Sequence, residues 1–348
     1  MTRTQNHHRT TAQDVAARAG VSQPTVSLVL SRNPHARIAP ETRARVLRAA
    51  EELGYRANLV ARGLKGQRSY AIGLLVPDTR NPFFVDVMSG AERVATAEGY
   101  ALLLSEQRAG SLDAQLETMR SRLIDGVIID AVGAASLPAD ALADLNVVLI
   151  DEPPSERWPG VASDALGAGR LAADHLLGHG HRRVAFIGPA TDVHATRMRE
   201  RGFVQALRVA GAPIESPLFR RAQATVAGGR MAMRALLALR ADQRPTAVFC
   251  GNDLLAVGAL KECTTSGIDV PRQLSIVGCD DIELARLVTP ELTTVAVPAR
   301  ELGARAARLL LATLEQKTAR VSQARPLPVT LVARGSSGPV PSSTVGAA

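Results

Sequence analysis

The stretch "TAQDVAARAGVSQPTVSLVL", residues 11–30, predicts two short helices separated by one glycine. Thr11 and Asp14 have the spacing of a capping box, in which each side chain binds the backbone amide of the other residue. A first helix should therefore run from Ala12 to Ala19. Gly20 follows it and favours the left-handed conformation in which helices commonly end.

A second helix is expected over 23–30. Ser22 can cap it, and Pro24 lies in its first turn, where a missing N–H leaves no hydrogen bond unmade. A third helix should begin at Pro40 and end at Gly54. Two short helices joined by a tight turn and braced by a third describe a helix-turn-helix, whose second helix enters the major groove of DNA. The apolar side chains that would form its small core are Val15, Ala19, Val21, Val26, Leu30, Val46, Leu47, Ala50 and Leu53.

The positive charge of the chain is concentrated in the same region. Residues 1–68 contain 12 Arg or Lys and 4 Asp or Glu, and the remainder contains 29 of each, so the whole net charge of +8 lies in the first segment. Such a localised basic region is the electrostatic footprint of nucleic-acid binding. A basic disordered tail would carry the same charge but not the ordered apolar pattern, so a DNA-binding module is favoured.

From residue 71 onward, short apolar runs such as "AIGLLVP", "DGVIID" and "LSIVGCD" alternate with amphipathic stretches such as "FVDVMSGAERVATAEG". Continuous apolar strands between helices predict parallel sheets that are covered on both faces. About 270 residues exceed one such sheet, so two α/β subdomains are expected.

Ligands of open α/β sheets bind beyond the carboxyl ends of the strands. Charged, polar and aromatic residues that follow the predicted strands would suit a small polar ligand in a cleft between the subdomains. The alternative is that these side chains only cap helices, as Asp and Asn often do. The candidates are Asp78, Asn81, Phe83, Phe84, Asp151, Asp164, Arg197, Asn252, Asp253 and Asp280.

The chain resembles the LacI/GalR (lac-repressor-type) family of bacterial transcription regulators. The resemblance covers nearly the whole sequence and rests on "TAQDVAARAGVSQPTVSLVLS", "IAPETRARVLRAAEELGYRANLVARGLK", "IGLLVPDTRNPFF", "GHRRVAFIGP", "PTAVFCGNDLLAVGAL", "SIVGCDDIELA" and "PELTTV", in this order. It implies an N-terminal all-α helix-turn-helix domain and an α/β core like that of periplasmic binding proteins, with two parallel-sheet subdomains. The implied function is that of a DNA-binding regulator, most simply a repressor, that responds to a small effector such as a sugar.

The resemblance also implies a domain order and residue roles. The DNA-binding domain spans 1–57, a hinge helix and linker 58–68, and the effector-binding and dimerisation core 69–335, while a Gly-, Ser- and Pro-rich tail over 336–348 is expected to be disordered. The residues implied in DNA binding are Thr11, Ser22, Gln23, Pro24, Thr25, Ser27 and Leu28, together with Asn58, Ala61 and the wedge leucine Leu64 of the hinge. The residues that the resemblance favours as effector contacts are Phe84, Asp151, Arg197, Asn252 and Asp280. Their positions after strands add Asn81, Phe83, Asp164 and Asp253 to the expected effector site.

Three positions depart from the family pattern. Ala165 stands where Asn is frequent, Ala224 where a stacking aromatic is frequent, and Val297 near the place of a common Gln. Each change removes a hydrogen-bonding group or a stacking surface, which leaves an effector other than a sugar open.

Other signals favour structural explanations. His175, His179 and His181 lack a further ligand for a metal site. The cysteines at 250, 263 and 279 are odd in number and fit buried packing in a reducing cytoplasm. No phosphate-binding or nucleophile motif supports an enzyme, so no catalytic residue, metal or cofactor is predicted. The N-terminus lacks an export signal and no run suits a membrane.

A homodimer on palindromic double-stranded DNA is expected, because one helix-turn-helix contacts too few base pairs. Two other functions remain as alternatives. A solute-binding protein for transport would share the two-subdomain fold, although the basic N-terminal module and the missing export signal disfavour it. An α/β enzyme acting on sugars or nucleosides would be distinguished by turnover of candidate ligands.

Overall fold

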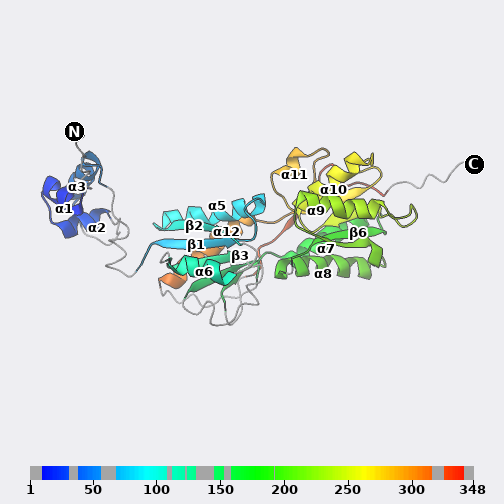
Figure 1. The fold of residues 1–348 in the computed structure, drawn as a ribbon, viewed down its shortest axis with the longest axis horizontal. Coiled ribbons are helices and arrows are strands. Elements are labelled where there is room, and N and C mark those ends of the chain that lie inside the picture. The colour runs from blue at the N-terminus through cyan, green and yellow to red at the C-terminus, as the bar shows by residue number, and fades with distance from the viewer. Residues whose placement is uncertain are drawn as a thin grey trace, which may run out of the picture. The chain divides into compact units, whose positions relative to one another are not determined.

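The computed structural model describes residues 10–30, 38–55, 68–107, 112–121, 124–130, 145–152, 158–191, 193–315 and 325–340. Contacts divide the chain into two compact units, residues 1–69 and residues 70–348. The described part of the first unit is helical, and the second combines helices with two sheets (Figure 1). None of the described helices combines the length and the apolar composition that crossing a membrane requires.

The first unit contains α1 (Ala12–Ala19), α2 (Gln23–Leu30) and α3 (Pro40–Glu52). The predicted capping box is present, with the Thr11 amide donating to Asp14 over 2.8 Å, and Gly20 ends α1 at φ 63°. The core of this unit consists of Val15, Ala16, Ala19, Val26, Val29, Val46, Ala49 and Ala50. The prediction of Leu47 as a core residue is wrong, because its side chain is 50% exposed and the adjacent Val46 points inward instead.

The first sheet of the second unit has the order β2-β1-β3-β4-β5, with all neighbouring strands parallel. Its strands are β1 (Ala71–Val76), β2 (Ala101–Glu106), β3 (Gly126–Asp130), β4 (Asn146–Ile150) and β5 (Gly160–Val161). Alternate residues of each strand point to opposite faces. One face packs against α6 (Leu112–Ser121), and the other packs against α5 (Pro82–Ala97) and α12 (Ala299–Leu314).

The contact between α5 and α12 joins segments that are two hundred residues apart in the sequence. A Cβ atom at Gly90 would lie 1.9 Å from the carbonyl oxygen of Arg300, and one at Gly303 would lie 1.9 Å from that of Val87. Only glycine permits this approach of two helix backbones. The C-terminal part of the chain therefore completes the first subdomain.

The second sheet has the order β11-β10-β9-β8-β6-β7. Its strands are β6 (Val184–Pro189), β7 (Phe219–Ala222), β8 (Ala247–Cys250), β9 (Ser275–Asp280), β10 (Thr293–Ala296) and β11 (Thr330–Val332). The two-subdomain prediction is confirmed, with one addition: the edge strand β11 is antiparallel. Two pairs of helices cover opposite faces of this sheet, α7 (Ala165–Gly178) with α8 (His194–Val209), and α9 (Val226–Leu237) with α10 (Asp253–Thr265). The short helices η3 (Ser216–Leu218) and α11 (Leu284–Leu287) lie in the connections.

The chain end packs onto the second sheet further than predicted. Ser336 is fully buried, accepts a hydrogen bond from the Thr293 amide at 2.8 Å and donates to the Ile276 carbonyl at 2.6 Å. The amide of Val340 donates to the His179 carbonyl at 2.9 Å. The prediction of a disordered tail is therefore wrong for residues 336–340, whose small and polar side chains satisfy buried strand groups. Residues 341–348 lie outside the described part.

Candidate functional sites

Helix α2 exposes four of the predicted DNA-contacting residues, Gln23, Pro24, Ser27 and Leu28, on its solvent side. Val26 and Val29 point into the core of the helical unit, and the side chains between them point outward. The Ser22 hydroxyl lies 2.9 Å from that of Thr25, which is half-buried. The exposed residues are Thr11, Ser22, Gln23, Pro24, Ser27 and Leu28. Asn58, Ala61 and Leu64, predicted to form the hinge, lie outside the described residues.

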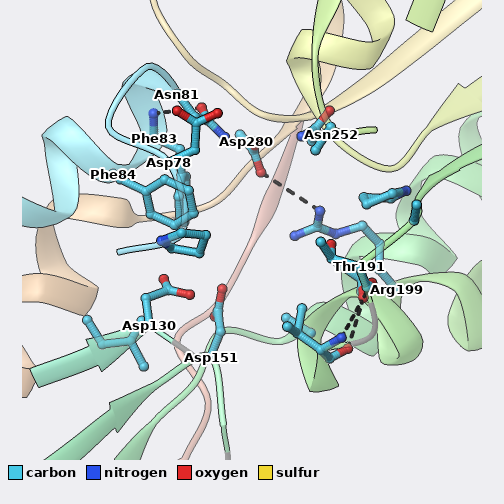
Figure 2. Close-up of a pocket in the computed structure, with 18 of the residues that line it drawn as sticks. Asp78, Asn81, Phe83, Phe84, Asp130, Asp151, Thr191, Arg199, Asn252 and Asp280 are labelled. Carbon is cyan, nitrogen blue, oxygen red and sulfur yellow. Dashed lines mark hydrogen bonds and ion pairs between the residues drawn. The ribbon is translucent and has the colours of Figure 1, made fainter. Parts of the chain in front are cut away.

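A cavity of about 470 Å³ lies where the carboxyl ends of strands from both sheets meet (Figure 2). The first sheet contributes residues that follow β1 and β4 and the last residue of β3. The second contributes residues at the ends of β6, β7, β8 and β9, together with the first turns of α8. This position and volume suit a small ligand.

One wall is aromatic. Phe83 and Phe84 lie in the first turn of α5, with ring centroids 5.4 Å apart and an edge-to-face angle of 82°. Asn81 caps this helix by accepting a hydrogen bond from the Phe83 amide at 3.1 Å. At the same wall Arg80 binds Asp78 through both Nε and Nη2, and this bond holds the pKa of the Asp78 carboxyl below its usual value.

Arg199 and Asp280 form the buried charged pair of the cavity. Arg199 Nη1 lies 3.8 Å from Asp280 Oδ1 and also donates to the Gly251 carbonyl. Asp280 ends β9 with φ 132°, a conformation that is costly for a residue with a side chain. Burial raises the pKa of Asp280, and Arg199 opposes that rise.

Two further carboxyl groups enter the cavity from the first sheet. Asp151 follows β4 at φ 56° and accepts a hydrogen bond from the Ser163 hydroxyl at 3.1 Å. Asp130 ends β3, and its Oδ2 is buried with no hydrogen-bond partner among the described residues. Burial raises the pKa of both carboxyls. For Asp130 the neighbouring carboxylates add to this rise, whereas Arg199 and Ser163 counteract it for Asp151.

The structure brings six of the nine predicted effector residues into the cavity wall: Asn81, Phe83, Phe84, Asp151, Asn252 and Asp280. Two of these, Asn81 and Asn252, are also helix caps, and Asn252 accepts from the Leu255 amide at 2.9 Å. Both explanations that the sequence left open therefore apply to them.

Three predicted residues do not line the cavity. Asp164 only caps α7, accepting from the Gly167 amide at 2.8 Å. Asp253 is fully buried and accepts from Thr294 Oγ1 at 2.6 Å and from the Ile282 amide at 3.0 Å, and burial raises its pKa to about 6. Arg197 is exposed, and the arginine of the cavity is Arg199.

Sequence reasoning missed Arg199 and Asp130. The signal for Arg199 is helical periodicity: Ala195, Arg199 and Phe203 are spaced by four and share the buried side of α8, whereas Arg197 is turned about 200° away from Arg199. Asp130 closes the apolar run "DGVIID" at the end of a fully buried strand, which is the position where a ligand-facing side chain is expected. Other missed lining residues are Glu152, Thr191, Gln223 and Thr225.

Of the three departures from the family pattern, only Ala224 lines the cavity. Ala165 begins α7 in a buried position. Val297 is also buried and lines a second hollow of about 330 Å³ beside Pro298 and Arg300. The departures at 165 and 297 therefore leave the wall of the main cavity unchanged.

The histidine cluster has structural partners. His181 is fully buried, with Nδ1 2.9 Å from Thr246 Oγ1 and Nε2 3.0 Å from the Gly338 carbonyl oxygen. His175 Nε2 lies 2.8 Å from Ser337 Oγ. Burial lowers the pKa of both rings. In the part of the chain that the structure describes, no three His, Cys, Asp or Glu side chains are placed to hold a metal ion.

Comparison with known proteins accounts for both units. Residues 11–58 match the family of bacterial regulatory proteins described as lacI family, and residues 173–337 match the periplasmic binding protein-like domain. The HTH-type transcriptional repressor CytR of Escherichia coli (strain K12) is 34% identical over 339 residues, which cover 95% of this chain and 97% of CytR.

Among the similar solved structures, the following two match over 94% of the chain. The complex of the transcriptional regulator CelR with cellobiose is 31% identical, with a TM-score of 0.67 and all of its own chain covered. The lac repressor dimer bound to operator and the anti-inducer ONPF is 27% identical, with a TM-score of 0.78 and 99% of its chain covered. Because the lacI-family model matches its first helices and relatives such as CytR match nearly its whole length, this chain belongs to the lacI family of bacterial regulatory proteins.

Proposed function

We propose that this protein is a cytoplasmic, sequence-specific DNA-binding repressor whose affinity for its operator is controlled by a small molecule bound in the central cavity. The observation that carries the proposal is the presence in one chain of a helix α2 with an exposed face and a cavity with a buried arginine–carboxylate pair. A binding protein for transport has no use for the first feature. The protein is proposed to catalyse no reaction.

The DNA-binding role rests on the solvent side of α2. Gln23 can bond to base edges, while Ser27 and the half-buried Thr25 can donate to phosphates. Leu28, 44% exposed, offers an apolar surface that suits a thymine methyl group. The basic charge of residues 1–68 supplies the sequence-independent attraction to phosphates.

The operator is proposed to be a palindrome bound by a homodimer. One recognition helix spans too few base pairs for specific binding, and two-fold symmetry doubles the contacts. Asn58, Ala61 and Leu64 are proposed to form a hinge at the operator centre, where Leu64 would wedge between base pairs. The lac repressor was solved as a dimer on its operator, which supports this arrangement.

The ligand role rests on Asp280, Asp151 and Asn252 at the strand ends and on Arg199 of α8. Charge-assisted hydrogen bonds from such groups are about twice as strong as neutral ones and orient a polar ligand. Phe83 and Phe84 provide the aromatic wall. CelR was solved with cellobiose, which supports a hydroxylated ligand of sugar-like chemistry here.

The experiment first selects the DNA sites that the protein binds and then tests whether metabolites change its affinity for them. Double-stranded DNA bound by the intact protein is selected from a randomised pool, and the enriched site is used in a gel-shift assay with a panel of metabolites. We expect a palindromic site and at least one metabolite that changes the affinity for it. Enrichment of no common sequence would overturn the DNA-binding function, and an affinity that no cavity ligand changes would overturn the control by effector.

A further inference from the structure

We infer that the ligand of the central cavity carries a protonated amine, which binds between Asp130 and the neighbouring carboxyl groups of the first sheet. This inference rests on the proposed function, because it names the class of molecule that would control DNA binding. The expected ligand is a hydroxylated amine and differs from a neutral sugar in its positive charge.

The first observation is the unpartnered carboxyl of Asp130. The side chain is 7% exposed, and its Oδ2 accepts no hydrogen bond from any described residue. Buried polar groups nearly always have partners, so an orphaned one marks the place of a missing donor. Figure 2 shows Asp130 and Asp151 directed into the cavity from neighbouring strands, on the side opposite Arg199.

The second observation is the charge of the described wall. Its carboxyl groups are Asp78, Asp130, Asp151, Glu152 and Asp280, and its arginines are Arg80 and Arg199. Arg80 binds Asp78, and Nη1 of Arg199 donates to the Gly251 carbonyl and lies 3.8 Å from Asp280. Nε of Arg199 has no partner among the described residues. The wall on the first-sheet side therefore has acceptors in excess of donors, which a cationic donor on the ligand would balance.

The raised pKa of the Asp130 carboxyl agrees with an excess of negative charge in this wall. Burial, followed by the carboxylates of Asp151, Asp280 and Glu152, raises the pKa of Asp130 well above its usual value. A cation placed among these groups would reverse the repulsive part of that rise. An anionic ligand would add to it.

The cation is an organic amine and not a metal ion. Within the described residues no three carboxylate, histidine or cysteine side chains are arranged to hold a metal. The carboxyl groups of the cavity wall are therefore expected to accept hydrogen bonds from different atoms of one organic ligand. The edge of the cavity formed by Phe83 and Phe84 adds a surface that favours a cation or an apolar ring face. The side-chain amides and hydroxyls of Thr191, Gln223 and Asn252 provide partners for ligand hydroxyls.

The test uses matched probes with the intact protein. Thermal shift and calorimetry compare D-glucosamine with D-glucose and N-acetyl-D-glucosamine, D-galactosamine with D-galactose, and 1,4-dideoxy-1,4-imino-D-ribitol with D-ribose. D-Glucuronate tests an anion. Each is measured on the wild type, on Asp130→Asn, and on the control Asp125→Asn. Asp125 precedes the same strand, and its carboxylate accepts from the Tyr70 amide, outside the cavity.

We expect at least one amine to bind roughly tenfold to a hundredfold more tightly than its neutral counterpart, as a hydrogen bond to a charged group would give. Asp130→Asn should remove most of this preference, and Asp125→Asn should retain it. Equal binding within every pair, a preference for D-glucuronate, or an amine preference that survives in Asp130→Asn would overturn the inference.

The failure of the inference is distinguishable from that of the proposed function. A protein that binds its selected operator, yet binds no amine probe, overturns the inference alone. A protein that binds an amine through Asp130 but selects no operator overturns the proposed function and leaves the ligand class standing.

Discussion

Arg199 and Asp280 meet in the central cavity, with Nη1 and Oδ1 3.8 Å apart, and both side chains are almost fully buried. Arg199 belongs to α8 and Asp280 ends β9, so their approach depends on the packing of this helix on the second sheet. The 3.8 Å separation is longer than a hydrogen bond. Nε of Arg199 has no hydrogen-bond partner among the described residues. The pair thus retains hydrogen-bonding capacity for a ligand.

The pH dependence of stability should reveal the buried carboxyl of Asp130. Its pKa is raised from 3.8 in the folded protein, so its stabilising contribution is complete below pH 4 and is lost as pH rises through the folded pKa. Asp130→Asn should leave the free energy of unfolding unchanged near pH 4 and raise it at neutral pH, because asparagine has no charge that burial disfavours. Urea denaturation from pH 4 to 8 measures this. A variant that is less stable than the wild type at pH 8 would contradict the assignment of an unpaired buried carboxyl.

The preference of the protein for particular DNA bases should change when Leu28 is replaced by arginine. Leu28→Arg replaces an apolar contact with a group that can bond bidentately to guanine, so one symmetric pair of operator positions should shift towards G·C. The discrimination gained is about 1–3 kcal/mol. Leu47→Arg is a matched control, because Leu47 lies on α3 and is similarly exposed, and this substitution adds the same charge. Sequencing of DNA selected by each variant gives the answer, and the same preference in both variants would remove Leu28 from the base-contacting set.

The first unit should be responsible for DNA binding and for its dependence on salt concentration. The intact protein should lose affinity steeply with rising salt, because bound Lys and Arg release counterions from phosphates. A protein beginning at Tyr70 contains the second unit alone, whose charges balance, and should keep ligand binding without measurable DNA binding. Fluorescence anisotropy over a salt series measures both. DNA binding retained by the shortened chain would place the interface elsewhere.

The packed chain end should contribute to the stability of the second subdomain. Ser336→Ala removes a partner from the buried Thr293 amide and another from the Ile276 carbonyl. Leaving buried backbone groups unpaired should lower the free energy of unfolding by about 1–3 kcal/mol. Ser266→Ala, in an exposed position after α10, should have little effect. Equal stability of the two variants in chemical denaturation would show that Ser336 is dispensable.

Local signals predicted most of the fold. The boundaries of α1 and α2 follow from a capping box and one left-handed glycine, which act over a few residues. The alternation of apolar runs and helices gave the two sheets. The antiparallel β11 and the return of α12 to the first subdomain depend on contacts between distant segments, such as Gly90 with Arg300, which local patterns do not contain.

The site was predictable where a strand end determines the side chain's position. Asp280 ends β9, Asp151 follows β4 and Asn252 lies two residues after β8, and all three reach the cavity. Arg197 and Arg199 lie beyond the strand on a helix, so the direction of the side chain depends on which face packs on the sheet. Position after a strand is not sufficient, as Asp253 shows. It lies beyond the end of β8, yet its carboxylate accepts hydrogen bonds from Thr294 and Ile282 in the interior and does not face the cavity.

A ligand in the cavity is proposed to control DNA binding through contacts with Arg199. The most direct measurement is the change in operator affinity with saturating ligand for the wild type, Arg199→Met and Arg197→Met, the last of which alters an exposed arginine two residues away. The wild type and Arg197→Met should shift by about 5- to 150-fold. Arg199→Met should bind the operator as tightly as the ligand-free wild type and show no shift. A full response in Arg199→Met, or its loss in Arg197→Met, would contradict control of DNA binding through Arg199.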